Sequence, residues 1–397
     1  MLILEVGDMK NPLNSKLKWK KATLKDLVFF QRGFDITKAE QIEGNVPVIS
    51  SSGITSYHSK SMATGPGIII GRKGTLGTVF YSKSNYWPHD TTLWSKSIKN
   101  NNARFVYYYL KTLRLENYNV GNANPTLNRN HIHGLKIRIP QNGEQEKIAD
   151  ILSAYDDLID NNRRRIQLSE ESARLLFREW FVYFRFPGHE NVKIVDGVPE
   201  GWKRINFMDI ISAIESGGRP KGGAIDEGIP SIGAENVNGI GNHNYSNEKY
   251  VPEEYYQKMK KGKVISKDVL LYKDGANIGR TTLVGYGYPH DKCCVNEHVF
   301  ILRTKNNLQN WLYFFLSQNF IQQVVANLNS NSAQPGISQD KLSSLKIIFP
   351  DEEIVRLFDD VTESIVKQIF ILSIQNQKLA QARDLLLPRL MSGVIEI

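Results

Sequence analysis

The sequence predicts an α+β protein built from two repeated α/β domains, each with a mixed sheet and short helices and each followed by a long helix. Three observations support this fold class. The chain has 397 residues, of which 41% are hydrophobic, whereas a single core stops growing at roughly 250–300 residues. A set of motifs occurs twice in the same order. Two long stretches also place apolar residues at three- and four-residue steps.

The repeat is visible from the start of each half. Trp19 opens the first copy and Trp202 opens the second, and a mix of polar and apolar residues follows each of them, as at the entry to a domain. A strand, a glycine turn and a second strand come next, at 67–81 and at 268–284, as expected of hairpin-like units. This shared order predicts that the two halves have one fold.

Both halves also close in the same way. A short aromatic segment and a polar loop lead to an apolar strand that ends at Pro140 or at Pro350, a shift of 350 − 140 = 210 positions. Between Gly74 and Gly275 the shift is 275 − 74 = 201 positions. The loops have therefore changed length while the order of the elements persisted, which is typical of a shared fold with different targets.

Two long helices are predicted at 144–182 and 351–387, neither of which contains proline or glycine. At about 1.5 Å per residue each helix would exceed about 50 Å. Because the halves are head-to-tail repeats, the simplest closed arrangement is pseudo-two-fold, with the helices antiparallel and zipped as a coiled coil. The predicted seam residues are Ile148, Leu152, Tyr155, Ile159, Ile166 and Leu176 in the first helix and Ile354, Val361, Ile365, Ile369, Leu372, Leu379 and Leu386 in the second.

Polar residues interrupt both predicted seams, Asn162 in the first helix and Gln375 and Asn376 in the second. These residues either set the register of the helices, at some cost in stability, or belong to a solvated face. The division of the chain that follows is a first domain at 1–143, a first helix at 144–184, a second domain at 185–350 and a second helix with a C-terminal tail at 351–397.

Charge and cysteine content bear on the partner of the protein and on its cellular compartment. Lys and Arg number 50 against 41 Asp and Glu, a net charge of +9, which favours a polyanionic partner but is weak evidence alone. Cys293 and Cys294 are adjacent in sequence and cannot form an ordinary structural disulfide. No run of about 18 apolar residues occurs, and the N-terminal apolar run is too short and too acidic for a signal peptide. A soluble protein in the reducing cytoplasm is expected.

The two helical segments carry a family resemblance. QEKIADILSAYDDLIDNNRRRIQLSEESARLLFREWF and LSIQNQKLAQARDLLLPRLMSG, preceded by strands ending in IRIP and IIFP, closely resemble the helical regions of the specificity (S) subunits of type I restriction-modification systems. The resemblance extends from about Leu17 to Gly393, and its helical ends are the most specific part. The intervening loops are not diagnostic, because members of that family diverge there.

The resemblance implies a function without a catalytic residue in this chain. In such proteins each target recognition domain reads one half of a bipartite site in double-stranded DNA, and the helices fix the spacer between the halves. The helix surfaces also dock two modification (methyltransferase) subunits, to which restriction/translocase subunits add. No cofactor is then expected on this chain, since S-adenosylmethionine, ATP and Mg would be bound by the partner subunits.

Residues that read DNA are expected in three polar loop clusters of each half. Arg and Lys recognise guanine and Asn and Gln recognise adenine, while glycine permits close approach of the backbone to phosphate. The same residue types are ordinary in turns, so the clusters carry more weight than their members. The candidates are Ser51, Ser52, Arg72, Lys73, Thr75, Asn122, Asn124, Thr126, Asn128 and Arg129 in the first half and Asn236, Lys273, Asn277, Arg280, Ser332, Gln334, Ser338 and Gln339 in the second.

The sequence lacks the motifs of the enzymes that act with DNA. The tetrapeptide at 124–127, NPTL, lacks the second proline and the aromatic residue of an amino-methyltransferase motif, and no GxxxxGK[ST] phosphate loop occurs. His131 with His133, His89 with Asp90, and the cysteine pair with His298 do not have the usual spacing of metal ligands, so no metal site is expected. Two alternatives stay open: a stand-alone metal-dependent DNA endonuclease and a non-catalytic protein-binding scaffold.

Overall fold

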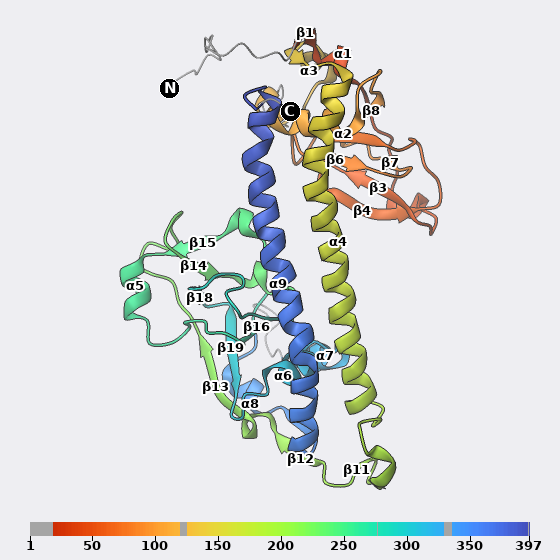
Figure 1. Cartoon of the computed structure of the whole chain (residues 1–397). Coiled ribbons are helices and arrows are strands. Elements are labelled where there is room, and N and C mark those ends of the chain that lie inside the picture. The colour runs from red at the N-terminus through yellow and green to blue at the C-terminus, as the bar shows by residue number, and fades with distance from the viewer. Residues whose placement is uncertain (1–18, 120–124, 276, 329–335, 396) are drawn as a thin grey trace. The chain divides into compact units, whose positions relative to one another are not determined.

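The structure is a computed structural model that describes residues 19–119, 125–275, 277–328, 336–395 and 397. The chain divides into two compact units, unit 1 with residues Met1–Leu158 and Leu379–Ile397 and unit 2 with residues Ile159–Lys378. Figure 1 shows two long helices, α4 (Asn142–Phe181) and α9 (Glu352–Met391). Each helix contributes a segment to both units. The four-part division expected from the sequence stays a prediction.

The described residues of unit 1 form three small sheets. The largest is antiparallel, in the order β2-β8-β5-β6. A second has the order β4-β3-β7, in which β7 runs parallel to β3, and the third pairs β1 with β9. The bounds are β1 (Lys20–Thr23), β2 (Phe29–Arg32), β3 (Val46–Ser50), β4 (Gly53–His58), β5 (Gly67–Gly71), β6 (Val79–Ser82), β7 (Trp87–Pro88), β8 (Thr92–Ser97) and β9 (Lys136–Ile139).

Short helices cover the four-stranded sheet of unit 1. Asn102 caps the longest of them, because its side chain accepts hydrogen bonds from the backbone N–H groups of Arg104 and Phe105. Phe105 is fully buried in one core with Phe30 and Ile68. The elements are α1 (Leu24–Leu27), α2 (Ala103–Thr112), α3 (Arg129–His133) and the 3₁₀ turns η1 (Lys38–Glu40) and η2 (Leu115–Tyr118).

Unit 2 repeats these sheets. Its four-stranded sheet has the order β13-β19-β16-β17, its three-stranded sheet the order β15-β14-β18 with β18 parallel to β14, and β12 pairs with β20. A hairpin of β10 and β11 precedes them. The bounds are β10 (Ile194–Val195), β11 (Val198–Pro199), β12 (Lys203–Asn206), β13 (Ile211–Ser216), β14 (Ile229–Ile232), β15 (Lys249–Val251), β16 (Val269–Tyr272), β17 (Thr281–Leu283), β18 (Cys294–Val295), β19 (Val299–Thr304) and β20 (Lys346–Phe349).

The matching strand orders confirm the repeat that the sequence predicts, since each strand of unit 1 has a partner of the same pairing and direction in unit 2. The helices of unit 2 are more numerous in its described residues and bury a larger aromatic core. They are η3 (His189–Asn191), η4 (Phe207–Asp209), η5 (Ala234–Asn236), η6 (Tyr245–Asn247), α5 (Glu253–Lys258), α6 (Gln309–Leu316), α7 (Asn319–Asn327) and α8 (Gln339–Ser343). None of the helices in the described ranges is long and apolar enough to cross a membrane.

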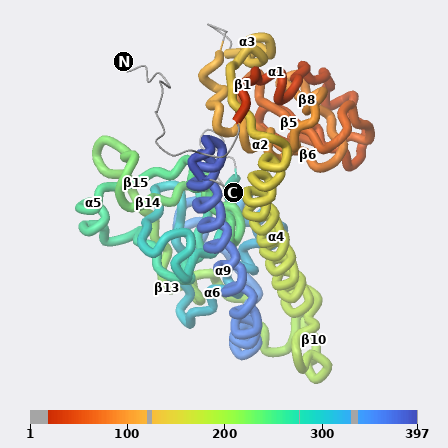
Figure 2. Tube along the Cα trace, turned by 45° about the horizontal axis from the view of Figure 1, so that its top comes forward, coloured from red at the N-terminus to blue at the C-terminus, as the bar shows by residue number. Residues whose placement is uncertain are grey.

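The two long helices run antiparallel within unit 2. Asn162 of α4 contacts Asn376 of α9, whereas Phe177 and Trp180, further along α4, pack against Phe358, which lies earlier on α9. Figure 2 shows α9 beside the strands of unit 2 in a second view. In unit 1 the same antiparallel order brings Asp156 and Arg383 together as an ion pair. The predicted fold class is confirmed.

The seam predicted for α4 lies on the buried side of that helix. Ile148, Leu152, Ile159 and Ile166 are buried, at 6% exposure or less, and Tyr155 and Leu176 are half-buried. In the second helix Ile369 and Leu372 are buried, whereas Ile354, Ile365, Leu379 and Leu386 are half-buried.

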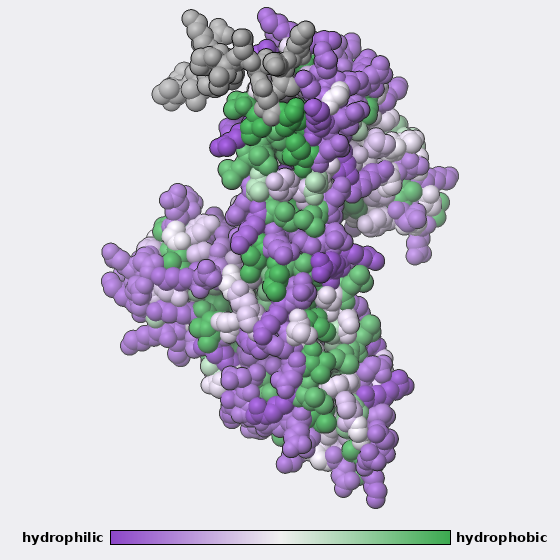
Figure 3. Space-filling view, in the orientation of Figure 1, coloured by the Kyte–Doolittle hydropathy of each residue, from purple (hydrophilic) through white to green (hydrophobic). Residues whose placement is uncertain are grey.

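The prediction that Val361 lies in the seam of α9 is wrong. Val361 is 43% exposed, and the neighbouring position Thr362 is buried instead. The heptad pattern misplaced Val361 because α9 does not face α4 alone. Phe358 also packs against Phe314 of α6, so the buried stripe of α9 is turned toward the core of unit 2. Leu357 and Ile371 are exposed as well, at 40% and 49%, and apolar side chains gather along α9 in Figure 3.

Candidate nucleic-acid interface

Three segments that the sequence singled out for DNA contact meet in unit 1. The backbone N–H of Leu127, just before α3, donates to the carbonyl of Arg72, just after β5, at 2.9 Å. Ser51, after β3, joins them, since the hydroxyl of Thr78 donates to the carbonyls of both Ser51 and Thr75, at 2.8 and 3.1 Å. These contacts define the loop cluster of unit 1, which comprises residues 50–52, 72–75 and 125–129.

A fourth segment completes this cluster, and sequence reasoning missed it. The backbone N–H groups of Arg72 and Lys73 both donate to the carbonyl of Thr91, at 2.8 and 3.1 Å. The adjacent Asp90 carboxylate pairs with the guanidinium of Arg32 at 2.9 Å. Arg32 and Asp90 are 58 positions apart, and only the pairing of β2 with β8 brings them together. No local motif could have indicated this pair.

Unit 2 builds the same arrangement with different side chains. The N–H of Ile337, before α8, donates to the carbonyl of Lys273 at 2.7 Å, and the N–H of Lys273 donates to the carbonyl of His298 at 3.1 Å. Glu297 pairs with Arg219 at 2.9 Å. Each contact has its counterpart in unit 1, so Lys273 takes the position of Arg72. The loop cluster of unit 2 comprises residues 233–235, 273–275, 296–298 and 336–339.

The ion pairs at these clusters are open to solvent. The side chain of Arg32 is 55% exposed and that of Arg219 is 50% exposed, and exposed pairs contribute only about 0–1 kcal/mol. Both arginines can therefore exchange a carboxylate for a phosphate or a base edge at little cost. Burial and the neighbouring charge of Arg32 lower the pKa of Arg72. That crowding of cations favours an approaching anion.

A hollow of about 380 Å³ lies in the loop cluster of unit 2. Its lining offers both donors and acceptors, which is the mixture that reading of base edges requires. Asn296 and Lys249 belong to this lining, and sequence reasoning assigned neither of them to DNA contact. The lining residues are Arg219, Ala224, Ser231, Glu235, Asn247, Lys249, Val251, Asn296 and His298.

Two of the residues predicted to contact DNA serve as helix caps. The side chain of Asn128 accepts a hydrogen bond of 2.9 Å from Asn130 N–H at the start of α3, and Ser338 caps α8 in the same way through Lys341 N–H. These roles account for an amide and a hydroxyl there without DNA. Other candidates have side chains turned to solvent, namely Ser52, Lys73, Thr75, Arg129 and Gln339.

The structure does not bring Asn236 or Arg280 into the cluster around Lys273. Asn236 is 5% exposed, and its side chain accepts a hydrogen bond of 2.8 Å from the backbone of Asn244. The Arg280 guanidinium reaches the side chain of Asn238 at 3.5 Å, in a separate polar hollow of about 290 Å³. Asn277 is exposed in the turn before Arg280.

The DNA-contact assignments as a whole stay predictions. The candidates outside the described residues are Asn122, Asn124, Ser332 and Gln334.

Comparison with known proteins matches this arrangement to one family. A family model for the type I restriction modification DNA specificity domain matches residues 16–170 and 199–372, once in each half of the chain. The chain belongs to that family. Its specificity-domain matches cover both loop clusters completely, and each match runs on into one of the long helices.

Relatives and a solved structure agree with the assignment to the specificity family. The type I restriction enzyme MjaIX specificity subunit of Methanocaldococcus jannaschii is 26% identical over 74% of this chain and 69% of its own length. The MjaVIII specificity subunit of the same organism is 22% identical over 96% of this chain and 93% of its own. The crystal structure of a type I S subunit from M. genitalium covers 95% of this chain and 97% of its own, with a TM-score of 0.59 and 17% identity, which supports the fold.

Proposed function

We propose that this specificity subunit reads a bipartite site in double-stranded DNA, with one loop cluster for each half. The observation that carries the proposal is the repeated cluster itself. The same backbone contacts hold Arg72 and Thr91 in unit 1 and Lys273 and His298 in unit 2. Because equivalent positions present different donors and acceptors, the two half-sites are expected to differ in sequence.

The long helices are proposed to set the spacer and to hold partner subunits. A helix of 40 residues such as α4 extends about 60 Å, more than one turn of DNA at roughly 34–36 Å. The exposed apolar residues Leu357, Val361 and Ile371 of α9 supply a surface for docking. Two modification subunits are the proposed occupants, with restriction/translocase subunits joining them.

Catalysis is assigned to the partners rather than to this chain. The modification subunits would bind S-adenosylmethionine, and the restriction subunits would bind ATP and Mg, while this chain supplies sequence recognition without turnover. Both cysteines are free thiols and are buried, in keeping with the proposed cytoplasmic location.

The test is a methylation assay of the complex reconstituted with its modification subunits. Sequencing of modified genomic DNA gives both half-sites and their spacing for the unaltered chain. Arg72→Ala is expected to relax one half-site and leave the other intact, whereas Lys273→Ala should do the reverse. Loss of both half-sites together in each variant, or cleavage of DNA by the chain alone, would contradict the proposal.

A further inference from the structure

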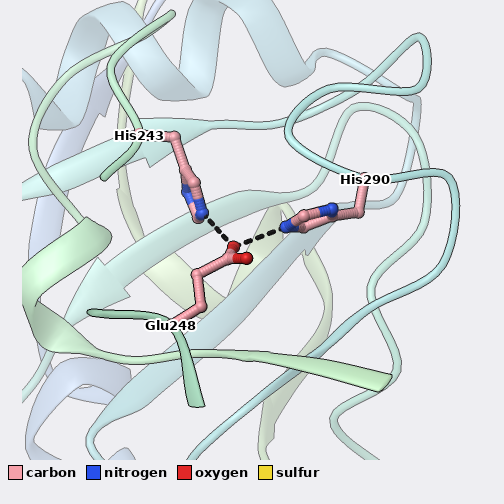
Figure 4. A group of neighbouring side chains, drawn as sticks. All are labelled: His243, Glu248 and His290. Carbon is pink, nitrogen blue, oxygen red and sulfur yellow. Dashed lines mark hydrogen bonds and ion pairs between the residues drawn. The ribbon is translucent and has the colours of Figure 1, made fainter. Parts of the chain in front are cut away.

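Three side chains that the proposed DNA contacts do not use converge in unit 2 (Figure 4). The Nε2 atoms of His243 and His290 each lie 2.5 Å from the same oxygen, Oε1 of Glu248. The ligand atoms of all three residues lie within 4.8 Å of one another. His243 and Glu248 lie on the loop between β14 and β15, while His290 lies between β17 and β18. Separate segments therefore aim two imidazoles and a carboxylate at one point.

The three side chains are largely shielded from solvent, and their neighbours hold the Glu248 carboxylate in place. The side chains of His243 and Glu248 are only 3% and 7% exposed, and that of His290 is 20% exposed. Tyr250 donates its hydroxyl proton to the other carboxylate oxygen, Oε2, at 3.1 Å. The ring of Tyr245 packs against both imidazoles, at centroid distances of 4.6 and 5.6 Å. Glu248 thus presents a single oxygen to the two histidines, and Tyr250 fixes its orientation.

The loop that carries His243 and Glu248 is long enough to gain stability from a cross-link. In unit 1, β3 ends at Ser50 and β4 begins at Gly53, so 53 − 50 − 1 = 2 residues connect them. In unit 2, the corresponding strands end at Ile232 and begin at Lys249, so 249 − 232 − 1 = 16 residues connect them. This longer loop contains two 3₁₀ turns. A long loop loses more entropy on ordering, and a cross-link within it compensates for that loss.

We propose that His243, Glu248 and His290 bind a divalent transition-metal ion of the zinc type, which ties the 233–248 loop to the segment at 290. Zinc binds histidine nitrogen at about 2.0–2.1 Å and carboxylate oxygen at about 2.0–2.2 Å, so tetrahedral ligands lie about 3.3 Å apart. Opening the present 2.5 Å contacts to that value is within reach of small side-chain rotations. A water molecule would supply the fourth ligand.

The ligand set favours zinc over the hard cations. Two imidazoles with one carboxylate suit zinc and its neighbours in the transition series, whereas Mg²⁺ and Ca²⁺ prefer oxygen ligands throughout. A second group, Asp35, His89 and Asp90, also comes within 4.8 Å in unit 1. There Asp35 is exposed and Asp90 already pairs with Arg32, so it does not offer a comparable site. The expectation of no metal site rested on ligands close in sequence, and His243 and His290 are 47 positions apart.

The experiment measures metal in the full chain, purified without a histidine tag. After metal is stripped with a chelator and Zn²⁺ is restored, elemental analysis of the gel-filtered protein is expected to give one zinc per chain. X-ray absorption is expected to show nitrogen and oxygen neighbours at about 2.0–2.1 Å. Mg²⁺ supplied in place of Zn²⁺ should not be retained. Failure of the unaltered chain to retain zinc would overturn the proposal.

Matched variants assign the metal to these side chains. His290→Ala and Glu248→Gln are expected to lose zinc affinity by more than the roughly 10–100-fold typical of changes outside the ligand shell. His131→Ala, which removes an exposed histidine on α3, should retain one zinc. Equal zinc content in all four proteins would overturn the assignment, and circular dichroism of each variant checks that it is folded.

Loss of zinc would also loosen Glu235 and Asn247, which border the hollow in the loop cluster of unit 2. We therefore expect metal-stripped complexes to lose selectivity at the half-site that Lys273→Ala affects. This consequence rests on the proposed function. Zinc content is measured without DNA, so failure of one proposal is distinguishable from failure of the other.

Discussion

Asn162 of α4 donates its side-chain amide to the side-chain oxygen of Asn376 of α9 at 3.0 Å. Asn162 is only 1% exposed. A buried polar pair costs stability in most registers, but it satisfies both partners in one register alone. Of the two interpretations open from the sequence, the buried hydrogen bond favours register for Asn162 and Asn376, whereas Gln375 lies on the exposed side of α9.

This pair leads to a double-mutant prediction. Asn162→Ala leaves the Asn376 amide without its partner and is expected to lower the free energy of unfolding by about 1–3 kcal/mol. Replacing both residues by leucine should lower the free energy of unfolding by less than the sum of the losses in Asn162→Leu and Asn376→Leu. The double variant leaves no unpaired polar group, whereas each single variant leaves one. Amide hydrogen exchange in β16 and β19 of the full chain measures both effects within unit 2. Strictly additive single effects would contradict the pairing.

The contrast between this pair and Val361 illustrates what the sequence can predict about the helices. Both helices were predicted to within a few residues of their bounds, because apolar spacing and the absence of glycine are local signals. The prediction for Val361 was wrong because the aromatic residues of α6 compete for the same helix, and a heptad pattern contains no information about that third element. Helix α9 also continues through Pro388, which lies in its last turns.

At the candidate sites, too, the sequence predicts what depends on local patterns and misses what depends on contacts between distant segments. The loops around Arg72 and Lys273 could be predicted because the repeat aligns them and because polar residues follow each glycine turn. Arg32, Thr91 and His290 could not be predicted, since strand pairing brings them to their partners from distant parts of the chain. A search for closely spaced metal ligands fails in the same way when the ligands come from two loops.

Asp359 supplies a prediction about pH. Its carboxylate accepts a hydrogen bond of 2.8 Å from Trp311 N–H at the start of α6, yet burial outweighs that bond and raises the pKa of Asp359 to about 6. The native state therefore binds a proton between about pH 4 and pH 6 that the unfolded state does not bind. Stability falls as pH rises through this range, and ionised Asp359 costs stability above it.

We therefore expect Asp359→Asn to raise the free energy of unfolding of unit 2 by about 1–3 kcal/mol at neutral pH. The side-chain oxygen of asparagine still accepts a hydrogen bond from the Trp311 N–H, so that contact is retained. The gain should disappear below about pH 4, where aspartate is protonated in both states. Hydrogen exchange as a function of pH measures the difference. Asp360→Asn, on the exposed side of α9, should show no such trend.

Arg303 supplies a prediction about a buried ion-pair network. Its guanidinium contacts the Asp268 carboxylate at 2.7 Å and that of Glu215 at 2.9 Å, and the side chain of Asp268 is only 1% exposed. Arg303→Met is expected to lower the free energy of unfolding by about 3–5 kcal/mol, because it leaves a buried carboxylate without a counter-charge.

An exposed pair in the same unit provides the control for Arg303. Arg185 and Glu179 lie 3.2 Å apart with side chains 64% and 45% exposed. Arg185→Met should change stability by less than about 1 kcal/mol. Urea titrations of both variants, read out by exchange of the β19 amides, give the comparison. Similar losses in the two variants would show that the burial of Asp268 does not determine the cost.

The spacer hypothesis gives a prediction that separates the helices from the loop clusters. The units meet in sequence after Leu158 on α4 and after Lys378 on α9. Four helix-forming residues inserted at both points add about one turn, or about 6 Å, to each helix and leave the contacts within each unit unchanged. At about 3.4 Å per base pair, the gap between the half-sites should lengthen by about two base pairs.

Sequencing of methylated DNA from cells that carry the altered complex gives the half-sites and the gap together. A four-residue insertion in the exposed turn at 196–197, between β10 and β11, should leave the gap unchanged. The ruler role fails if the double insertion preserves methylation at the original spacing, since the helices would then not determine the distance between the bases that are read.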